Sequence, residues 1–429
     1  MAIPDPSAAE AEDAAAPARP RERSHVRAAL VSFEQRDFRY LGLSTLVLGL
    51  GQWAQQIAIA WLALELTGSP IQLGAISAFR GGVGVFASPL GGYLADRFPR
   101  RMVTVWTTIA SAVQASIFAL LLLSGHIQLW EVYVLAFAGG VIQSLAQPAR
   151  QSLVYDVTTN ETLFNAVALN SVMQNFARIS GPPLSGAIIG FWGTGTLFVA
   201  LAGTQLVAVA LTLMISAQTR QQQLTGGRGA AAALGDVMDG FRYTWSNKLV
   251  LGLMIGQAIP ILLVAPYIPF VAVFAKDVLH RGPEAYGQLA SMVGWGSILG
   301  LAVLTLMGDP KRKGMMMIGA FMCYLMLLLV FTRSQDFTLS LAALACAGIF
   351  SSVGFALNTT LIQLAADNAY RGRVNAVWHL VSGLQPLGAL PMGLLIERRG
   401  APFGVGSFVV AAIIALALFG LTFRSVRRA

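Results

Sequence analysis

The chain has 429 residues, of which 55% are hydrophobic and only 11% are charged, and its formal net charge is +9. A soluble domain carries about twice this share of charged residues, so the composition excludes an ordinary soluble protein. It predicts an integral membrane protein built of α-helices. The two cysteines, Cys323 and Cys346, lie inside apolar runs, which argues against a disulfide framework or a thiol metal site.

The first 36 residues are rich in alanine, proline and charge, as in "AEDAAAPARPRER". Such a composition cannot bury enough apolar surface to fold by itself, and it lacks the apolar core of a cleaved signal peptide. We therefore expect residues 1–36 to form a disordered cytoplasmic tail.

A membrane-spanning helix needs about 20 mostly apolar residues. Twelve segments meet this requirement, at approximately 38–65, 71–94, 102–124, 128–149, 162–191, 194–216, 248–275, 284–307, 314–332, 337–362, 373–396 and 402–423. Their connections are short except for 217–247, which contains "QTRQQQLTGGRGA" and which we expect to be a flexible cytoplasmic linker. This linker divides the chain into two six-helix halves, 37–216 and 248–429.

Lysine and arginine are distributed unevenly over the two sides of this arrangement. If the N-terminus is cytoplasmic, 22 of the 29 basic residues fall in inner segments and five fall in outer ones. This bias predicts that both termini lie in the cytoplasm. Inner segments facing anionic lipid account for the net positive charge, so no nucleic-acid partner is needed.

The two halves resemble each other in sequence. A shift of 210 residues places "LFNAVALN" (163–170) over "RVNAVWHL" (373–380), and a shift of 213 places Gly74 on Gly287 and Asp96 on Asp309. Duplicated six-helix units are typical of secondary transporters, whose substrate site lies near the membrane midplane between the halves. The pattern therefore predicts two pseudo-repeats around a central site.

The loop between the second and third spans, "GGYLADRFPRR" (91–101), gathers one carboxylate and three arginines after a long apolar run. A carboxylate there can pair with basic groups or with the positive end of a neighbouring helix, closing the inner side in one state and releasing it in another. The alternative is that the arginines only anchor the topology. Acidic residues contribute little to topology, so this alternative explains Asp96 less well.

This loop resembles the signature of the major facilitator superfamily, G-x-x-x-D-R-x-G-R-R. The matching residues are Gly92, Asp96, Arg97, Arg100 and Arg101, with Pro99 where the signature has glycine. "GDPKRKG", with Asp309, is a weaker second copy. The segment 147–186 is similar to the branch of enterobactin-type siderophore exporters and macrolide efflux proteins. The resemblance implies the twelve-helix major facilitator fold, alternating access and coupling to protons.

The fifth span contains "ARISGPPLSG". Gly181, Pro182 and Gly186 resemble the G-P-x-x-x-G element of drug/proton antiporters, although Ala177 replaces a further glycine of that pattern. Prolines interrupt the backbone hydrogen bonds and small residues allow close helix packing, so this span is expected to bend and pack tightly. The resemblance favours export, while an ordinary kinked span is the alternative.

Two arginines, Arg80 and Arg178, fall at membrane depth, where a lone charge costs at least about 2.5 kcal/mol and must face a cavity or a partner. We expect them to line the substrate cavity with other polar residues of the spans: Gln52, Gln56, Gln143, Asn170, Gln174, Asn358 and His379. About half of these residues would instead form interhelical hydrogen bonds, and packing is favoured over proton transfer for His379. No carboxylate lies mid-membrane, so the sequence assigns no proton carrier.

The sequence contains no H-E-x-x-H, G-x-S-x-G or phosphate-binding G-x-x-x-x-G-K-[ST] motif, and it predicts neither an enzyme nor an ATP-driven pump. We expect a monomeric, multi-pass exporter of a small siderophore-like or drug-like organic molecule in the bacterial cytoplasmic membrane. Its other partners would be protons and the lipid bilayer, with no cofactor or metal. The alternatives are a solute-importing facilitator or symporter and a non-transporting receptor on the same fold.

Overall fold

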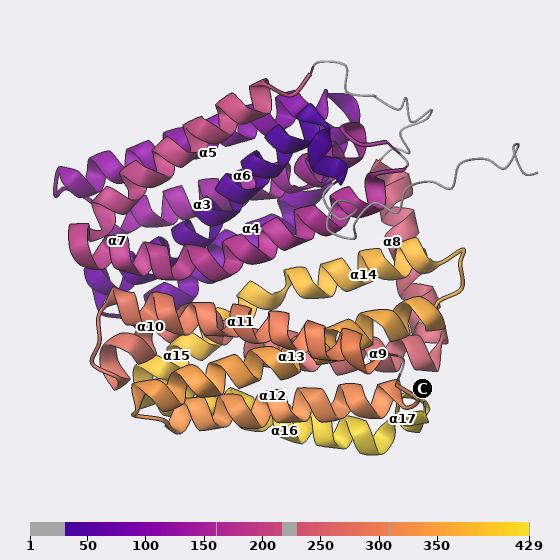
Figure 1. The fold of residues 1–429 in the computed structure, drawn as a ribbon. Coiled ribbons are helices and arrows are strands. Elements are labelled where there is room, and N and C mark those ends of the chain that lie inside the picture. The colour runs from indigo at the N-terminus through magenta and orange to yellow at the C-terminus, as the bar shows by residue number, and fades with distance from the viewer. Residues whose placement is uncertain (1–30, 160, 217–229, 309, 429) are drawn as a thin grey trace, which may run out of the picture.

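The computed structural model describes residues 31–159, 161–216, 230–308 and 310–428. Within these ranges the secondary structure is helical and contains no strand. Three predictions fall wholly or partly outside them: the second gate residue Asp309, residues 1–30 of the tail and residues 217–229 of the linker. Figure 1 shows the N-terminal half packed along the C-terminal half, with the long helices of both running between the same two ends.

The N-terminal half contains six spans. Its elements are η1 (Val31–Glu34), α3 (Arg36–Thr67), α4 (Pro70–Arg97), α5 (Arg100–Leu123), α6 (Leu129–Asp156) and α7 (Leu163–Leu213). α7 comprises two spans, because Gly193 has a φ of 83° and a ψ of 164° and breaks the helix. A positive φ is readily adopted only by glycine, so this residue makes the tight turn between the fifth and sixth spans.

The C-terminal half also contains six spans, and two of them are irregular. The first span consists of α9 (Lys248–Ala258), the π-helix η2 (Ile259–Val264), the 3-10 helix η3 (Ala265–Phe270), α10 (Val271–Val273) and the π-helix η4 (Phe274–Val278). The other elements are α11 (Pro283–Met307), α12 (Lys313–Arg333), α13 (Phe337–Ala365), α14 (Arg371–Gly383), η5 (Gln385–Gly388), α15 (Ala389–Arg399), α16 (Ala401–Thr422) and α17 (Arg424–Arg428). α14, η5 and α15 together form one span.

Eleven helical segments of the described chain are long and apolar enough to cross a membrane. Because the segment Leu163–Leu213 is two spans joined at Gly193, the structure confirms the twelve spans expected from the sequence. Proline removes a backbone donor from a helix. Pro260, Pro266 and Pro269 lie in the irregular part of the first C-terminal span, and Pro386 lies in η5.

The connection between the halves differs from the flexible linker that we expected. Residues 230–246 form α8 (Ala230–Ser246), which packs against α14 and α9. The ring of Tyr243 stacks on Tyr370 at a centroid distance of 4.3 Å, and its hydroxyl donates to Asp367 Oδ2 at 3.0 Å. These contacts order this part of the connection, which sequence composition alone had suggested was flexible.

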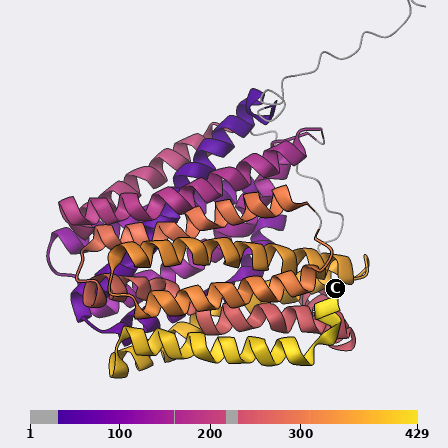
Figure 2. The same cartoon turned by 60° about the horizontal axis from the view of Figure 1, so that its bottom comes forward.

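The two ends of the bundle are named here by their residues. The basic end carries the connections around residues 97–100 and 156–163, α8 and α17, and it lies to the right in Figure 1. The far end carries the connections around residues 67–70, 123–129, 278–283, 333–337 and 399–401. Figure 2, in which the C-terminal half comes forward, shows the same two ends.

One apolar core joins the two halves, and it does so toward the far end. Its N-terminal members lie in the parts of their spans nearest that end, among them 54–64 of α3, Leu73 and Ile76 of α4, and Phe118 of α5. At the basic end, the N-terminal half has separate clusters of its own around Phe38 and Val103. The halves are therefore sealed together at the far end.

Candidate functional site

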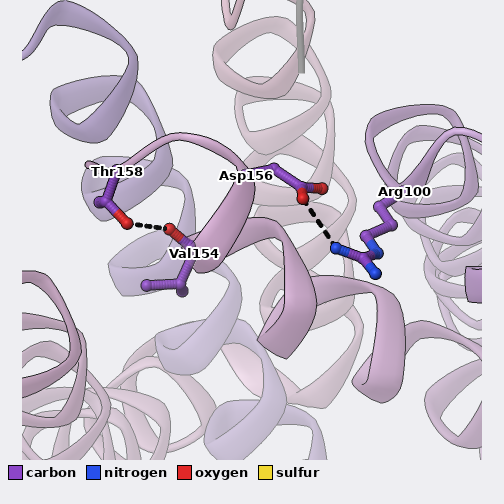
Figure 3. Close-up of polar contacts among 4 residues, drawn as sticks. All are labelled: Arg100, Val154, Asp156 and Thr158. Carbon is purple, nitrogen blue, oxygen red and sulfur yellow. Dashed lines mark hydrogen bonds and ion pairs between the residues drawn. The ribbon is translucent and has the colours of Figure 1, made fainter. Parts of the chain in front are cut away.

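The arginines of the signature loop are anchored to neighbouring helix ends. Arg100 Nη1 lies 2.7 Å from Asp156 Oδ1 at the end of α6, as Figure 3 shows. Arg101 Nε donates to the carbonyl of Thr212 at 3.2 Å, and its Nη2 donates to the carbonyl of Leu213. A cation at the C-terminus of a helix is favoured by the helix dipole, so Arg101 fastens the loop to the sixth span.

Asp156 is a functional candidate that the sequence analysis did not single out. Its side chain is only 6% exposed, and the turn that follows it is held by Thr158 Oγ1, which donates to the carbonyl of Val154 at 2.8 Å (Figure 3). The available signal was a lone carboxylate at the basic end of the fourth span, opposite a loop with three arginines. Fifty-six residues separate Asp156 from Arg100, so the sequence gave no direct indication of the pairing.

Asp96, the expected gate residue, is exposed and forms no hydrogen bond or ion pair with a described residue. Its neighbour Arg97 instead donates from Nη1 to the hydroxyl of Tyr93, and Gly92 borders open space. The proposed latch at Asp96 is therefore released in this conformation. Its role in another conformation stays a prediction.

A cavity of about 400 Å³ lies between the two halves. Its polar lining includes Gln52 and Gln56 of α3, Arg80 of α4 and Gln143 of α6, and the opposite wall includes Pro266, Pro269 and Gln385. Arg80 is half-buried, and its side chain forms no hydrogen bond or ion pair with a described residue. It lies ten residues into α4, about 15 Å along the helix, which places this central cavity near mid-span.

A second cavity of about 330 Å³ lies within the N-terminal half, nearer the basic end. Its lining comes from α3, α6 and α7: Thr45, Gly49, Gln52, Trp53, Gln147, Arg150, Gln151, Asn170, Ser171, Gln174, Asn175 and Arg178. Gln52 lines both cavities. The sequence analysis placed Arg150 among the topological residues of the inner side, whereas the structure makes it a cavity residue.

Neither cavity has an aspartate or glutamate in its lining. Arg150 Nη2 donates to Gln147 Oε1 at 2.9 Å, and Arg178 Nη2 donates to Ser297 Oγ of α11 at 2.7 Å. These partners are neutral, so the positive charges of Arg80, Arg150 and Arg178 are not balanced within the linings. The site favours an anionic or neutral ligand over a cation.

The far end of the central cavity is closed by contacts between the halves. Glu397 of α15 accepts hydrogen bonds from Ser69 Oγ at 2.6 Å and from the Ile71 amide at 3.1 Å. Lys276 Nζ donates to the carbonyl of Leu64 at 3.1 Å. With the apolar core around them, these contacts block passage at this end and leave the basic end as the side from which the cavities are approached.

Residues 27–427 match the profile of the family described as transmembrane secretion effector, which covers nearly the whole chain. The chain belongs to this family of major facilitator transporters. It is a multi-pass protein of the bacterial inner membrane. The two six-helix halves, the signature loop and the cavity between the halves are the features by which the fold performs transport.

Relatives with known names are similar over most of their length. The chain is 23% identical to the staphyloferrin A transporter of Staphylococcus aureus over 84% of this chain and 90% of that protein. It is 22% identical to the enterobactin exporter EntS of Shigella flexneri over 83% of this chain and 85% of that protein. These similarities support a transporter of the siderophore-exporter branch.

Solved structures of other transporters share the fold. The nucleoside transporter NupG superposes with a TM-score of 0.73 at 12% identity, covering 91% of this chain and 100% of that one. A bacterial homologue of the human lysosomal transporter Spinster, in its inward-facing and unoccupied conformation, superposes with a TM-score of 0.70 at 14% identity, covering 92% and 98%. At this level of identity the likeness establishes the fold alone.

In this major facilitator transporter, the glycines of the fifth span lie at two different contacts. A Cβ on Gly181 would lie 2.8 Å from Trp53 Cβ of α3, and one on Gly186 would lie 2.4 Å from the carbonyl oxygen of Pro283 at the start of α11. The carbonyl oxygen of Pro182 lies equally close to the Cβ position of Gly287. The span thus packs tightly against its own half and against the other half, as expected for small residues in a membrane bundle.

Two of the expected cavity residues line neither cavity. Asn358 of α13 is completely buried, and its Nδ2 donates to the side-chain oxygen of Gln257 in α9. His379 of α14 is exposed, with its ring edge against Trp378. Asn358 therefore follows the alternative of an interhelical hydrogen bond, whereas Gln52, Gln56, Arg80, Gln143, Asn170, Gln174 and Arg178 lie at the cavities.

Proposed function

We propose that this transporter exports a small, siderophore-like organic anion across the inner membrane, as a monomer, in exchange for protons. The observation that carries the proposal is the cavity between the halves, which presents Arg80 and no carboxylate. The names of the staphyloferrin A transporter and of the enterobactin exporter support the substrate class and the direction.

The charge of the cavity favours an acidic substrate. Arg80 presents up to five N–H donors, and each charge-assisted hydrogen bond to a bound anion stabilises it by about 1.5–3 kcal/mol. A cationic drug would lose its hydration next to a like charge, which is unfavourable. Carboxylate, catecholate and neutral molecules are therefore preferred over cations.

The closed far end supports alternating access. We place the basic end in the cytoplasm, because the signature loop and most basic side chains lie there. In this orientation the observed conformation receives substrate from the cytoplasm. Export then requires that the contacts of Glu397 and Lys276 break and that the basic end closes, with Asp96 forming its latch.

Proton exchange is proposed from the resemblance of the span that contains Gly181, Pro182 and Gly186 to drug/proton antiporters. Since the linings of both cavities lack carboxylates, the coupling proton is expected to bind at a carboxylate outside them. Asp96 and Asp156 at the basic end and Glu397 at the far end are the candidates, because each lies where the two conformations differ or where the signature loop is held.

Proteoliposomes with the purified transporter test this proposal. A panel of catecholate and carboxylate siderophores is offered with an imposed pH gradient and no ATP. Accumulation that follows the gradient, with protons moving in the opposite direction, is the expected result. Flux that ignores both the pH gradient and the membrane potential would identify a facilitator, and ligand binding without any flux would identify a receptor.

A further inference from the structure

The second cavity is built from donors. It combines two arginines with five amide side chains, from Gln147, Gln151, Asn170, Gln174 and Asn175, in addition to the Gln52 that it shares with the central cavity. Along α7 the polar residues 170, 174 and 178 recur every fourth position, so they face one side of the helix. A cavity rich in N–H donors and lacking carboxylates is suited to bind oxygen atoms that carry negative charge.

Arg150 is directed to this cavity rather than neutralised by the protein. Its one guanidinium hydrogen bond with a described residue is the bond to Gln147, which leaves other N–H donors unused. The nearest carboxylate along α6, Asp156, is already held by Arg100 at 2.7 Å. A purely topological arginine would lie in water at the end of the helix, whereas Arg150 is half-buried and lines a cavity.

The two cavities lie in sequence along the path between the halves. On α6, Gln143 lines the central cavity and Arg150 lines the second one, seven residues farther toward the basic end. Seven residues are almost two turns, so both side chains point to the same side and are offset by about 10 Å along the axis. Gln52 of α3 belongs to both linings and connects them.

We infer that the cavity around Arg150 and Arg178 is a first binding station for a substrate with at least two carboxylate groups, ahead of the central station at Arg80. The inference rests on the proposed export function, because it takes the basic end as the side from which substrate arrives. One carboxylate binds Arg150 while the substrate still contacts water, and the other reaches toward Arg80 past Gln52. Two cationic stations about 10 Å apart select an extended molecule with separated acidic groups.

Citrate is the probe that tests the station, titrated calorimetrically into the detergent-purified full-length protein. Arg150→Gln should weaken citrate binding about tenfold, the loss expected from removing one charge-assisted hydrogen bond. Arg150→Lys should restore part of it, since the charge is kept. The neutral trimethyl ester of citrate should bind no variant, and Arg333→Gln, which changes an exposed arginine at the far end, should bind citrate as the unmodified protein does.

A second variant keeps the test decisive if Arg150→Gln does not fold. Gln174 is exposed at the same cavity, so Gln174→Glu should fold normally and abolish citrate binding by placing a like charge in the station. Normal citrate binding by Gln174→Glu, or by a folded Arg150→Gln, would overturn the inference. So would binding of phosphatidylglycerol with none of citrate, because the ligand would then be a lipid headgroup.

The binding test and the export test fail independently. Calorimetry is performed without a membrane or a gradient, so a loss of binding in Arg150→Gln supports the station whatever the direction of transport. Conversely, gradient-driven flux of a siderophore with citrate binding unchanged in Arg150→Gln and Gln174→Glu would keep the export proposal and remove the station.

Discussion

Glu397 of the C-terminal half caps the first turn of α4 in the N-terminal half, accepting hydrogen bonds from Ser69 Oγ at 2.6 Å and from the Ile71 amide at 3.1 Å. The first amides of a helix have no partners within it, and a carboxylate at this position is also favoured by the helix dipole. The contact can exist only while the far end is closed. Glu397 is therefore placed to stabilise the closed far end directly.

Replacing Glu397 should open the far end more often. Removal of such a cap costs about 1 kcal/mol, so Glu397→Ala should raise the population open at the far end about fivefold. Ala60 lines the central cavity and is 3% exposed. With Cys323 and Cys346 replaced by serine, a cysteine at position 60 reports the change as faster labelling by a membrane-impermeant thiol reagent from the far side.

Glu131→Ala is the matched control for this experiment. Glu131 caps its own helix by accepting from the Gln128 amide at 2.8 Å, at the same end of the bundle but within one half. It should not change the labelling rate at position 60. Equal labelling in Glu397→Ala and in the unmodified protein would show that the cap does not hold the halves together.

The ion pair of Arg100 and Asp156 should contribute to stability in the observed conformation. The two side chains are 18% and 6% exposed, so the pair is better shielded than a surface salt bridge. Arg100→Gln and Asp156→Asn should each cost about 1–3 kcal/mol, and the double variant should cost clearly less than the sum. Unfolding of the detergent-solubilised variants measures this coupling, and strictly additive losses would contradict it.

Asp96→Asn should reduce transport severely while membrane abundance stays near normal. Asp96 is exposed and has no partner among the described residues, so its amide analogue should not disturb the observed state. The loss is expected because the carboxylate is needed to latch the basic end in the other state. Glu161→Gln, an exposed carboxylate at the same end, is the control, and near-normal flux in Asp96→Asn would remove the gate assignment.

Gly186→Ala should impair the transporter where Gly203→Ala does not. A Cβ at position 186 would lie 2.4 Å from the carbonyl oxygen of Pro283, so α7 and α11 must separate to accommodate it. Gly203 lies on the same helix α7 with nothing within 4 Å of its Cβ position, so alanine there should be neutral or slightly stabilising. Transport and unfolding of the two variants test the difference, and equal behaviour would show that the close contact is not required.

The sequence was sufficient for the spans because each is encoded locally by the length of an apolar run. Even the boundary between residues 191 and 194 was recovered, where Gly193 breaks α7. α8 was missed because its order comes from contacts with residues more than 120 positions away, such as the hydrogen bond from Tyr243 to Asp367. A local composition signal carries no information on such contacts.

The candidate site was recovered in part for the same reason. Arg80 and Arg178 stood out because a charge in an apolar run is locally conspicuous. Arg150 did not, since it lies near the end of its span, where basic residues are ordinary. The cap by Glu397 joins positions 328 residues apart and depends on the conformational state, so no local pattern predicts it.

Arg80 and Arg178 should set the charge preference of transport, and Arg80 should do so more directly. Arg80 lines the central cavity without a hydrogen bond or ion pair to a described residue, whereas Arg178 also bonds Ser297 across the two halves. Arg80→Gln should therefore lower transport of anionic candidates about tenfold, as expected for one lost charge-assisted hydrogen bond, and relax the discrimination against cations.

Arg178→Gln should have two effects, because its guanidinium both lines the second cavity and bridges the halves. Transport of anions should fall, and the closed far end should become less populated. The measurements are proteoliposome flux of matched anionic and cationic compounds, with the amount of folded transporter determined in parallel. Ser297→Ala separates the two effects, since it removes the bridge and keeps the charge. If Ser297→Ala reproduces the whole defect of Arg178→Gln, or if both arginine variants keep their selectivity while losing abundance, these arginines hold the bundle together and do not select the substrate.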